Sequence, residues 1–158
     1  MAHREGIRAY LKNVEVHGLV YDWGCGTKPI ENHLKQNNAR FVTLDQLDHV
    51  KPTKVVDFEQ PQPVYDEADF AFCIEVLEQV WNIKVLLTSI FFNLKKEGVL
   101  YLSQPFFYEV HKEDDRVRYT WRGLHQLLTE AGFLVNEIVP TVGSLDKAEG
   151  YVLKATKV

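Results

Sequence analysis

The sequence contains little cysteine and no long apolar run. Its 158 residues include only two cysteines, Cys25 and Cys73, which fit no common metal-site spacing. We therefore expect reduced thiols in a cytoplasmic protein with no bound metal. Both cysteines lie near expected strand ends, so a disulfide between them remains the alternative. No apolar stretch approaches the length that crosses a bilayer, and residues 1–10 lack the apolar core of a signal peptide.

A basic excess is also missing. The formal net charge is -4 and the pI is about 5.9, which argues against a nucleic-acid groove, because such a groove needs a basic face. We find no internal repeat, linker or low-complexity tract. A hydrophobic content of 46% is typical of a globular protein with a buried core. The length suits one domain, and we expect it to cover residues 1–158.

The segment 20–29, Val-Tyr-Asp-Trp-Gly-Cys-Gly-Thr-Lys-Pro, predicts a buried strand, a tight turn and the start of a helix. Gly24 and Gly26 have no Cβ, so a ligand can lie against the backbone there. A dinucleotide turn reads G-x-G-x-x-G, but Pro29 replaces the third glycine and donates no N–H. Asp22 would repel a diphosphate and attract a cation. The turn therefore favours S-adenosylmethionine, which carries an ammonium and a sulfonium, over NAD; a turn without a ligand is the alternative.

The spacing of apolar residues predicts alternating helices and strands. We expect an opening helix near residues 7–14 that covers one side of a ligand cleft or simply packs on the core. A second helix should run from Pro29 to Asn37-Asn38, a third from Ile83 to Gly98, with Lys95 and Lys96 in its last turn, and a fourth from Thr120 to Gly132. The expected strands are residues 18–21, 39–44, 54–59, 68–74, 99–103, 133–139 and 151–158, the last two antiparallel.

Acidic residues follow the second and third expected strands. Asp45 lies about 20 residues beyond the glycine turn, where a carboxylate can accept hydrogen bonds from ribose hydroxyls; a solvated turn aspartate is the alternative. Asp57 could accept from an adenine amino group while Phe58 packs on the ring. The alternative for Phe58 is the hydrophobic core.

The segment after the fifth expected strand supplies candidates for catalysis and for acceptor binding. His111 is the candidate base, because an unperturbed histidine pKa of about 6.5 suits proton transfer near neutral pH. Arg118 and Tyr119 could hold an anionic or hydroxylated acceptor, and Phe106 could form a wall of its site. The alternatives are a solvated histidine, Arg118 paired with Asp115, and Tyr119 packed under the next helix.

Taken together, the motifs resemble those of class I S-adenosylmethionine-dependent methyltransferases over about residues 16–158. The similarity rests on VYDWGCGTKP, Asp45, VVDFEQP, CIEVLEQV and GVLYLSQP. The segment DDRVRYTWRGLHQLLTEAGF is similar to a bacterial branch of small methyltransferases, some of which belong to polysaccharide or surface-glycan pathways.

The resemblance implies an α/β fold: a doubly wound, Rossmann-like sheet of seven strands in the order 3-2-1-4-5-7-6, with strand 7 antiparallel and helices on both faces. It implies methyl transfer from S-adenosylmethionine to a small-molecule or glycan-type acceptor. By position, the cofactor would contact Asp22, Gly24, Cys25 and Gly26 at its methionine end, Asp45 and Gln46 at the ribose, Asp57 and Phe58 at the adenine, and Ile74 and Glu75 on the floor.

Two departures from the family pattern support an alternative. Related motifs often carry a histidine where this chain has Gln79, and few residues precede the first strand to form a lid. The chain could be a non-catalytic cofactor-binding subunit that stabilises a partner enzyme, or a homo-oligomer in which another subunit supplies the lid. A nicotinamide-dependent oxidoreductase is less favoured, because the chain has no room for a substrate domain.

Overall fold

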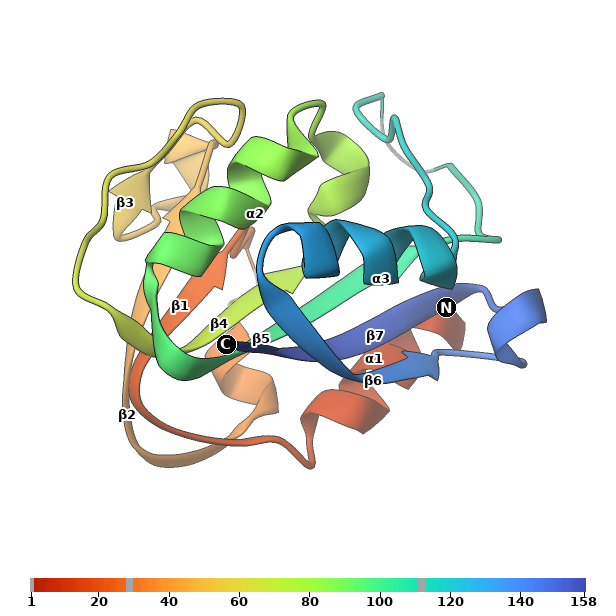
Figure 1. The fold of residues 1–158 in the computed structure, drawn as a ribbon, viewed down its shortest axis with the longest axis horizontal. Helices are drawn as coiled ribbons and strands as arrows, with labels where there is room; N and C mark the ends of the chain where they lie inside the picture. The colour runs from red at the N-terminus through yellow and green to blue at the C-terminus, as the bar shows by residue number, and fades with distance from the viewer. Residues whose placement is uncertain (1, 28–29, 111–112) are drawn as a thin grey trace.

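A computed structural model describes residues 2–27, 30–110 and 113–158 (Figure 1). Its seven strands form one sheet in the order β3-β2-β1-β4-β5-β7-β6. Strands β1 to β5 pair in parallel, and β7 runs antiparallel to both β5 and β6. The strand order and the antiparallel last strand expected from the family resemblance are therefore confirmed. The helices are α1 (Ala2–Leu11), η1 (Ile30–His33), η2 (Asp48–Val50), η3 (Leu77–Gln79), α2 (Ile83–Phe92), α3 (Trp121–Glu130) and η4 (Leu145–Lys147); the strands are β1 (Glu15–Trp23), β2 (Lys35–Asp45), β3 (Lys54–Val55), β4 (Ala68–Ile74), β5 (Leu94–Pro105), β6 (Phe133–Pro140) and β7 (Gly150–Lys157).

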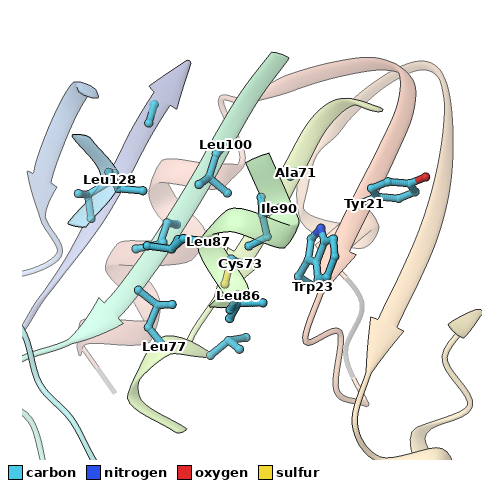
Figure 2. Close-up of a cluster of buried hydrophobic side chains, with 14 of the residues drawn as sticks. Tyr21, Trp23, Ala71, Cys73, Leu77, Leu86, Leu87, Ile90, Leu100 and Leu128 are labelled. Carbon is cyan, nitrogen blue, oxygen red and sulfur yellow. The ribbon is translucent and has the colours of Figure 1, made fainter. Parts of the chain in front are cut away.

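Helices cover both faces of the sheet (Figure 1). Helices α2 and α3 pack on one face, where Figure 2 shows Leu86, Leu87 and Ile90 of α2 beside Trp23 and Cys73 of the strands. Helix α1 and η1 pack on the opposite face in a smaller cluster. The central strands are buried on both sides, as the apolar character of parallel strands requires.

The crossover from β1 to β2 differs from the sequence expectation. Instead of a helix reaching Asn37-Asn38, the described residues of this connection form the single turn η1, and β2 already begins at Lys35. Because Lys35 pairs with Glu15 at the start of β1, the chain must return along the whole length of β1. Nine strand residues span about 30 Å, whereas the eight residues 27–34 would span about 12 Å as a helix. A full helix is therefore too short for this connection. Pro29, the expected first helical residue, lies outside the described residues.

Helix α2 is shorter than expected. It ends at Phe92 rather than near Gly98, so Lys95 lies within β5 and not in the last turn of the helix. The cause is Asn93, which is fully buried. Its side-chain nitrogen donates to the Ser89 and Pro63 carbonyls at 2.9 and 3.0 Å, and its side-chain oxygen accepts from a loop amide. These bonds end the helix and attach the preceding loop to it.

Strand β3 contains only two residues, so Asp57 and Phe58 follow the strand instead of closing it. Within the described ranges, no helix combines the length and the apolar character needed to cross a membrane. Both cysteines are buried and free, as expected for reduced thiols.

Candidate functional site

A cavity of about 240 Å³ opens at the carboxyl ends of β1 and β4. In parallel α/β sheets, ligands bind at this edge, where the strand order reverses. The sheet side of the cavity is formed by Asp22, Gly24, Cys25, Ile74 and Glu75, and its other walls by α1, by Ile30 and His33 of η1, and by Gln79 of η3. Five of the ten residues predicted to contact a cofactor thus line one cavity.

The two turn glycines have different roles. Gly24 has φ +85, and a Cβ there would lie 2.2 Å from Val76 Cγ2, so only glycine fits beside the loop after β4. Gly26 has φ +54 and meets nothing within 4 Å of its Cβ position. The Gly24 amide donates to the Leu44 carbonyl at 2.7 Å, which fixes the turn against β2. The open space at Gly26 is where a ligand can approach the backbone.

Asp22 is a buried acid at the end of β1. The residue is 3% exposed, and its Oδ2 accepts the Ile30 amide at 2.9 Å. Its pKa is raised to about 7, chiefly by burial and to a smaller degree by the nearby Asp45 and Glu31 carboxylates, while the Ile30 N–H acts to lower it. A cation in the cavity would favour the charged form and lower this pKa. Asp22 is therefore suited to a positively charged ligand.

Asp45 closes β2 beside the glycine turn and is 7% exposed. Its Oδ2 accepts the Gly26 amide at 2.8 Å and its Oδ1 accepts the Leu47 amide at 3.0 Å. It is not among the described residues that line the cavity. Each carboxylate oxygen still has a second acceptor position. Asp45 thus shapes the turn and keeps the capacity to accept from ribose hydroxyls.

The adenine expectation requires a correction at Phe58. Its ring is 3% exposed and packs in the core, with its centroid 6.3 Å from that of Trp23. A ring that is buried this deeply cannot stack on an adenine. Gln46 is exposed, and its side-chain oxygen accepts the Phe58 amide at 3.1 Å. Asp57 is exposed, and its Oδ1 accepts the Glu59 amide at 2.9 Å, so this turn is held by its own polar groups.

Arg118 is committed to the segment that contains it. Its five N–H donors make five hydrogen bonds: two to the Asp115 carboxylate, at 3.0 and 2.5 Å, and three to the carbonyls of Phe106, Tyr108 and Glu109. A guanidinium has only five donors, so in this conformation none is left for an acceptor. The expectation that Arg118 binds an acceptor is corrected accordingly: it folds the loop.

The other residues expected near the acceptor lie in the same region. Tyr119 is half-buried against the core, and its amide donates to Gln104 Oε1 at 3.1 Å. Phe106 is also half-buried, with its ring centroid 5.8 Å from that of Tyr151. His111, the candidate base, lies outside the described residues. Within the described part of the chain, no three His, Cys, Asp or Glu side chains are grouped to hold a metal ion.

Comparison with known protein families settles the relationship. A family model described as a methyltransferase domain matches residues 4–138, most of the chain. The chain belongs to this methyltransferase domain family. A search of curated proteins finds no match.

Several solved structures with the same fold are described as methyltransferases, all of low sequence identity to this chain. An S-adenosylmethionine-dependent methyltransferase from Mesorhizobium loti shares 14% identity with a TM-score of 0.72, over 99% of this chain and 98% of that one. The Burkholderia thailandensis 1,6-didemethyltoxoflavin-N1-methyltransferase, with bound 1,6-didemethyltoxoflavin and S-adenosylhomocysteine, shares 17% with a TM-score of 0.69, over 99% and 78%. A chain from the complex of the Haloferax volcanii Trm112 methyltransferase activator with a putative methyltransferase shares 16% with a TM-score of 0.73, over 99% and 89%. At such identities, the likeness shows the fold alone.

One buried contact beside the cavity of this methyltransferase domain is not predicted by the sequence. His3 is completely buried; its Nε2 lies 3.0 Å from Glu75 Oε1 and its Nδ1 lies 2.7 Å from Thr141 Oγ1. The same Glu75 oxygen accepts the Ser103 hydroxyl at 2.9 Å. Gly150 makes room, because a Cβ there would lie 2.2 Å from His3 Cε1. The available signal was helical spacing: His3 lies four residues before Ile7, on the buried side of α1.

Glu78 is a second buried acid of the domain. Its side chain is fully buried, and within the described residues neither carboxyl oxygen has a hydrogen-bond partner. Burial raises its pKa to about 8, with Glu75 as the next contributor. Burial therefore favours its protonated, uncharged form. Its backbone carbonyl accepts the amides of Arg116 and Val117, which anchors the segment before α3.

Proposed function

We propose that this chain binds S-adenosylmethionine in the cavity at β1 and β4 and transfers its methyl group to a small-molecule or glycan-type acceptor. The observation that carries the proposal is Asp22: a buried acid whose pKa is raised to about 7, beside a glycine turn, in a member of the methyltransferase domain family. A raised acid pKa in a cavity marks a candidate binding site.

The residues present fit the cofactor. Asp22 supplies the negative charge for an ammonium or sulfonium, the Cβ position of Gly26 has open space around it, and Asp45 retains acceptor capacity for the ribose. When bound, S-adenosylmethionine supplies an activated methyl group on a sulfonium with a good, neutral leaving group. The protein's main task is then alignment, and holding reactants in line can lower a barrier by roughly 7–11 kcal/mol.

A base is required only for an acceptor that must lose a proton. His111 remains our candidate for that step. The remaining candidates for contact with the acceptor are Tyr119 and Phe106. Both are half-buried on the segment between β5 and α3, so an acceptor bound there would contact aromatic side chains. This suits a ring-containing small molecule or a sugar.

The first experiment measures ligand binding directly. In a thermal-shift screen, S-adenosylmethionine or S-adenosylhomocysteine at about a hundred times its dissociation constant should stabilise the fold by roughly 2.7 kcal/mol, and NAD should not. Calorimetry should then show S-adenosylmethionine binding to Asp45→Ala at least about tenfold weaker, since hydrogen bonds to a charged group contribute about 1.5–3 kcal/mol each. Asp48→Ala, an exposed acid on η2, is the matched control.

Two results would overturn the proposal: binding of NAD in place of the adenosyl ligands, or unchanged affinity in Asp45→Ala. Because Asp45 also holds the Gly26 and Leu47 amides, the unfolding of the free variant must be measured in parallel. A variant that is folded and binds weakly supports the ribose role.

A non-catalytic cofactor-binding subunit is the second candidate, and Gln79 favours it. Its side-chain amide donates to the Glu75 carbonyl at 3.1 Å, and its own carbonyl accepts from Arg116 at 2.7 Å. Gln79 lines the cavity with an amide that cannot act as a base. Cofactor binding without turnover of any acceptor, together with co-purification of a partner enzyme, would favour this candidate.

A further inference from the structure

A second hollow, of about 320 Å³, lies beside a different side of α1. It is bounded by the end of α1, the start of β1 and the face of β5, β7 and β6. Among the described residues, it shares no lining residue with the cavity at β1 and β4. We call it the α1–β7 groove. Its polar and aromatic lining residues are Tyr10, Asn13, Glu15, Tyr101, Glu137 and Lys154.

The floor of the α1–β7 groove is a row of side chains across three strands. Tyr101 of β5 pairs with Lys154 of β7, and Lys154 pairs with Glu137 of β6. Because directly paired residues point to the same face of a sheet, a phenol, an ammonium and a carboxylate lie side by side there. Tyr101 is 6% exposed, and its ring stacks on Phe72 of β4 with the two centroids 5.1 Å apart. The row is therefore held in place by the sheet and its core.

Helix α1 contacts this row through Tyr10. The Tyr10 hydroxyl donates to Glu137 Oε2 at 2.5 Å, and the Tyr10 ring lies edge-on to Tyr101 with the centroids 6.2 Å apart. Just after the helix, the Asn13 side-chain nitrogen donates to the Ala9 carbonyl at 3.2 Å, which leaves the side-chain oxygen as an acceptor. An aromatic ring and an amide are thus fixed beside the row before any ligand binds.

Two polar groups of the α1–β7 groove are not used by the fold. Within residues 2–27, 30–110 and 113–158, the Lys154 ammonium forms neither a hydrogen bond nor an ion pair, although Glu137 is its neighbour in the row. The Tyr101 hydroxyl likewise has no hydrogen-bond partner in these ranges. The pKa of Tyr101 is raised, chiefly by burial and next by Glu137, so the hydroxyl keeps its proton and can donate. Because polar groups on buried side chains are normally hydrogen-bonded, the partner of this hydroxyl comes from outside the chain.

The chemistry of the groove favours a neutral ring that carries several hydroxyl groups. The carboxylates of Glu15 and Glu137 outnumber the single ammonium of Lys154, which disfavours a phosphate or a carboxylate ligand. Carboxylates only accept hydrogen bonds and an ammonium only donates them, whereas a hydroxyl does both. Neighbouring hydroxyl groups of one ligand can therefore satisfy all three side chains. The tyrosine rings supply apolar surface for the C–H groups of the same ligand.

We propose that the α1–β7 groove is a binding site for a neutral sugar unit, with Lys154 and Tyr101 hydrogen-bonded to its hydroxyl groups and the Tyr10 ring beside it. The inference does not depend on the proposed function, because the groove and the cavity at β1 and β4 have separate walls in the described part of the chain. It gives the domain a second binding site, at which α1 serves as one wall.

The test is a protein NMR titration of the isotope-labelled chain with glucose, galactose and mannose. At least one sugar should shift the amide signals of Glu137 and Lys154 saturably, with a dissociation constant on the order of millimolar. Lys154→Ala should bind that sugar about tenfold more weakly, because a hydrogen bond to a charged group is lost. Tyr101→Phe keeps the ring on Phe72 and removes only the hydroxyl, and it should weaken binding by about threefold or more. Lys147→Ala is the matched control, since Lys147 is an exposed lysine on η4 that does not line the groove.

Several results would overturn the sugar site. One is the absence of saturable shifts with all of these sugars, and another is a set of shifts confined to residues outside the groove. Binding of glucuronate without binding of the neutral sugars also overturns it, because the groove would then be an anion site. So does wild-type sugar affinity in folded Lys154→Ala and Tyr101→Phe. The affinity for S-adenosylhomocysteine should stay within about twofold of the wild type in both variants, so failure of the sugar site and failure of the proposed function are measured separately.

Discussion

Asp22 allows the electrostatics of the site to be tested without any ligand. The residue is 3% exposed, and its pKa is raised from 3.8 to about 7, chiefly by burial. Because the folded chain binds this proton more tightly than the unfolded chain, the native state loses stability as the pH rises between these two values. The full loss is roughly 4 kcal/mol. Asp22→Asn removes the charge, while its amide oxygen can still accept the Ile30 N–H that Asp22 accepts at 2.9 Å.

The variant should therefore be more stable than the wild type at alkaline pH. We expect its advantage in unfolding free energy to be roughly 2 kcal/mol larger at about pH 8.5 than at about pH 5.5. Urea titrations at the two pH values, followed by tryptophan fluorescence, measure this difference, since Trp23 is buried beside the site. Asp48→Asn, an exposed acid, should show no such pH dependence. An advantage of equal size at both pH values, or a variant less stable at pH 8.5, would refute the reasoning.

Two further substitutions test the turn and the loop. Gly24→Ala should lower the unfolding free energy by about 1–3 kcal/mol, because φ is +85 and the added Cβ would lie 2.2 Å from Val76. Gly26→Ala, which has open space at its Cβ position, should lower the unfolding free energy by less, as measured by thermal unfolding. Equal losses of stability in the two variants would contradict the steric argument. Arg118→Lys should destabilise the segment after β5 by about 1–3 kcal/mol and speed the cleavage of this segment in limited proteolysis. Arg122→Lys is the control and should change neither, because the Arg122 side chain is 71% exposed. Unchanged cleavage in Arg118→Lys would show that the five hydrogen bonds of Arg118 do not hold the segment.

The sequence placed residues of the cavity wall better than it placed the connections around them. Gly24 and Asp22 were identifiable because their constraints are local: a tight turn needs glycine, and an acid beside it selects charge. The prediction of a helix running from Pro29 to Asn37-Asn38 was wrong for a non-local reason. Ile30 and Leu34 gave a helical spacing, but spacing carries no information about the distance back to Glu15, where β2 begins its pairing.

Burial also could not be read from residue type. Phe58 and Phe106 are both aromatics after strands, yet one is 3% exposed in the core and the other is half-buried on a loop. His3 and Thr141 are 138 residues apart, so no window along the chain relates them. For Arg118, the alternative of pairing with Asp115 was available from spacing, because the two lie three residues apart, but the three carbonyl bonds depend on how the loop folds.

The segment before β1 suggested an incomplete lid in the sequence, but in the structure it forms α1, which packs on the sheet. A helix of ten residues is marginal by itself in water, so α1 stays over the cavity through its contacts with the rest of the fold, which include the buried His3, Ile7 and Leu11 and the hydrogen bond from Tyr10 to Glu137.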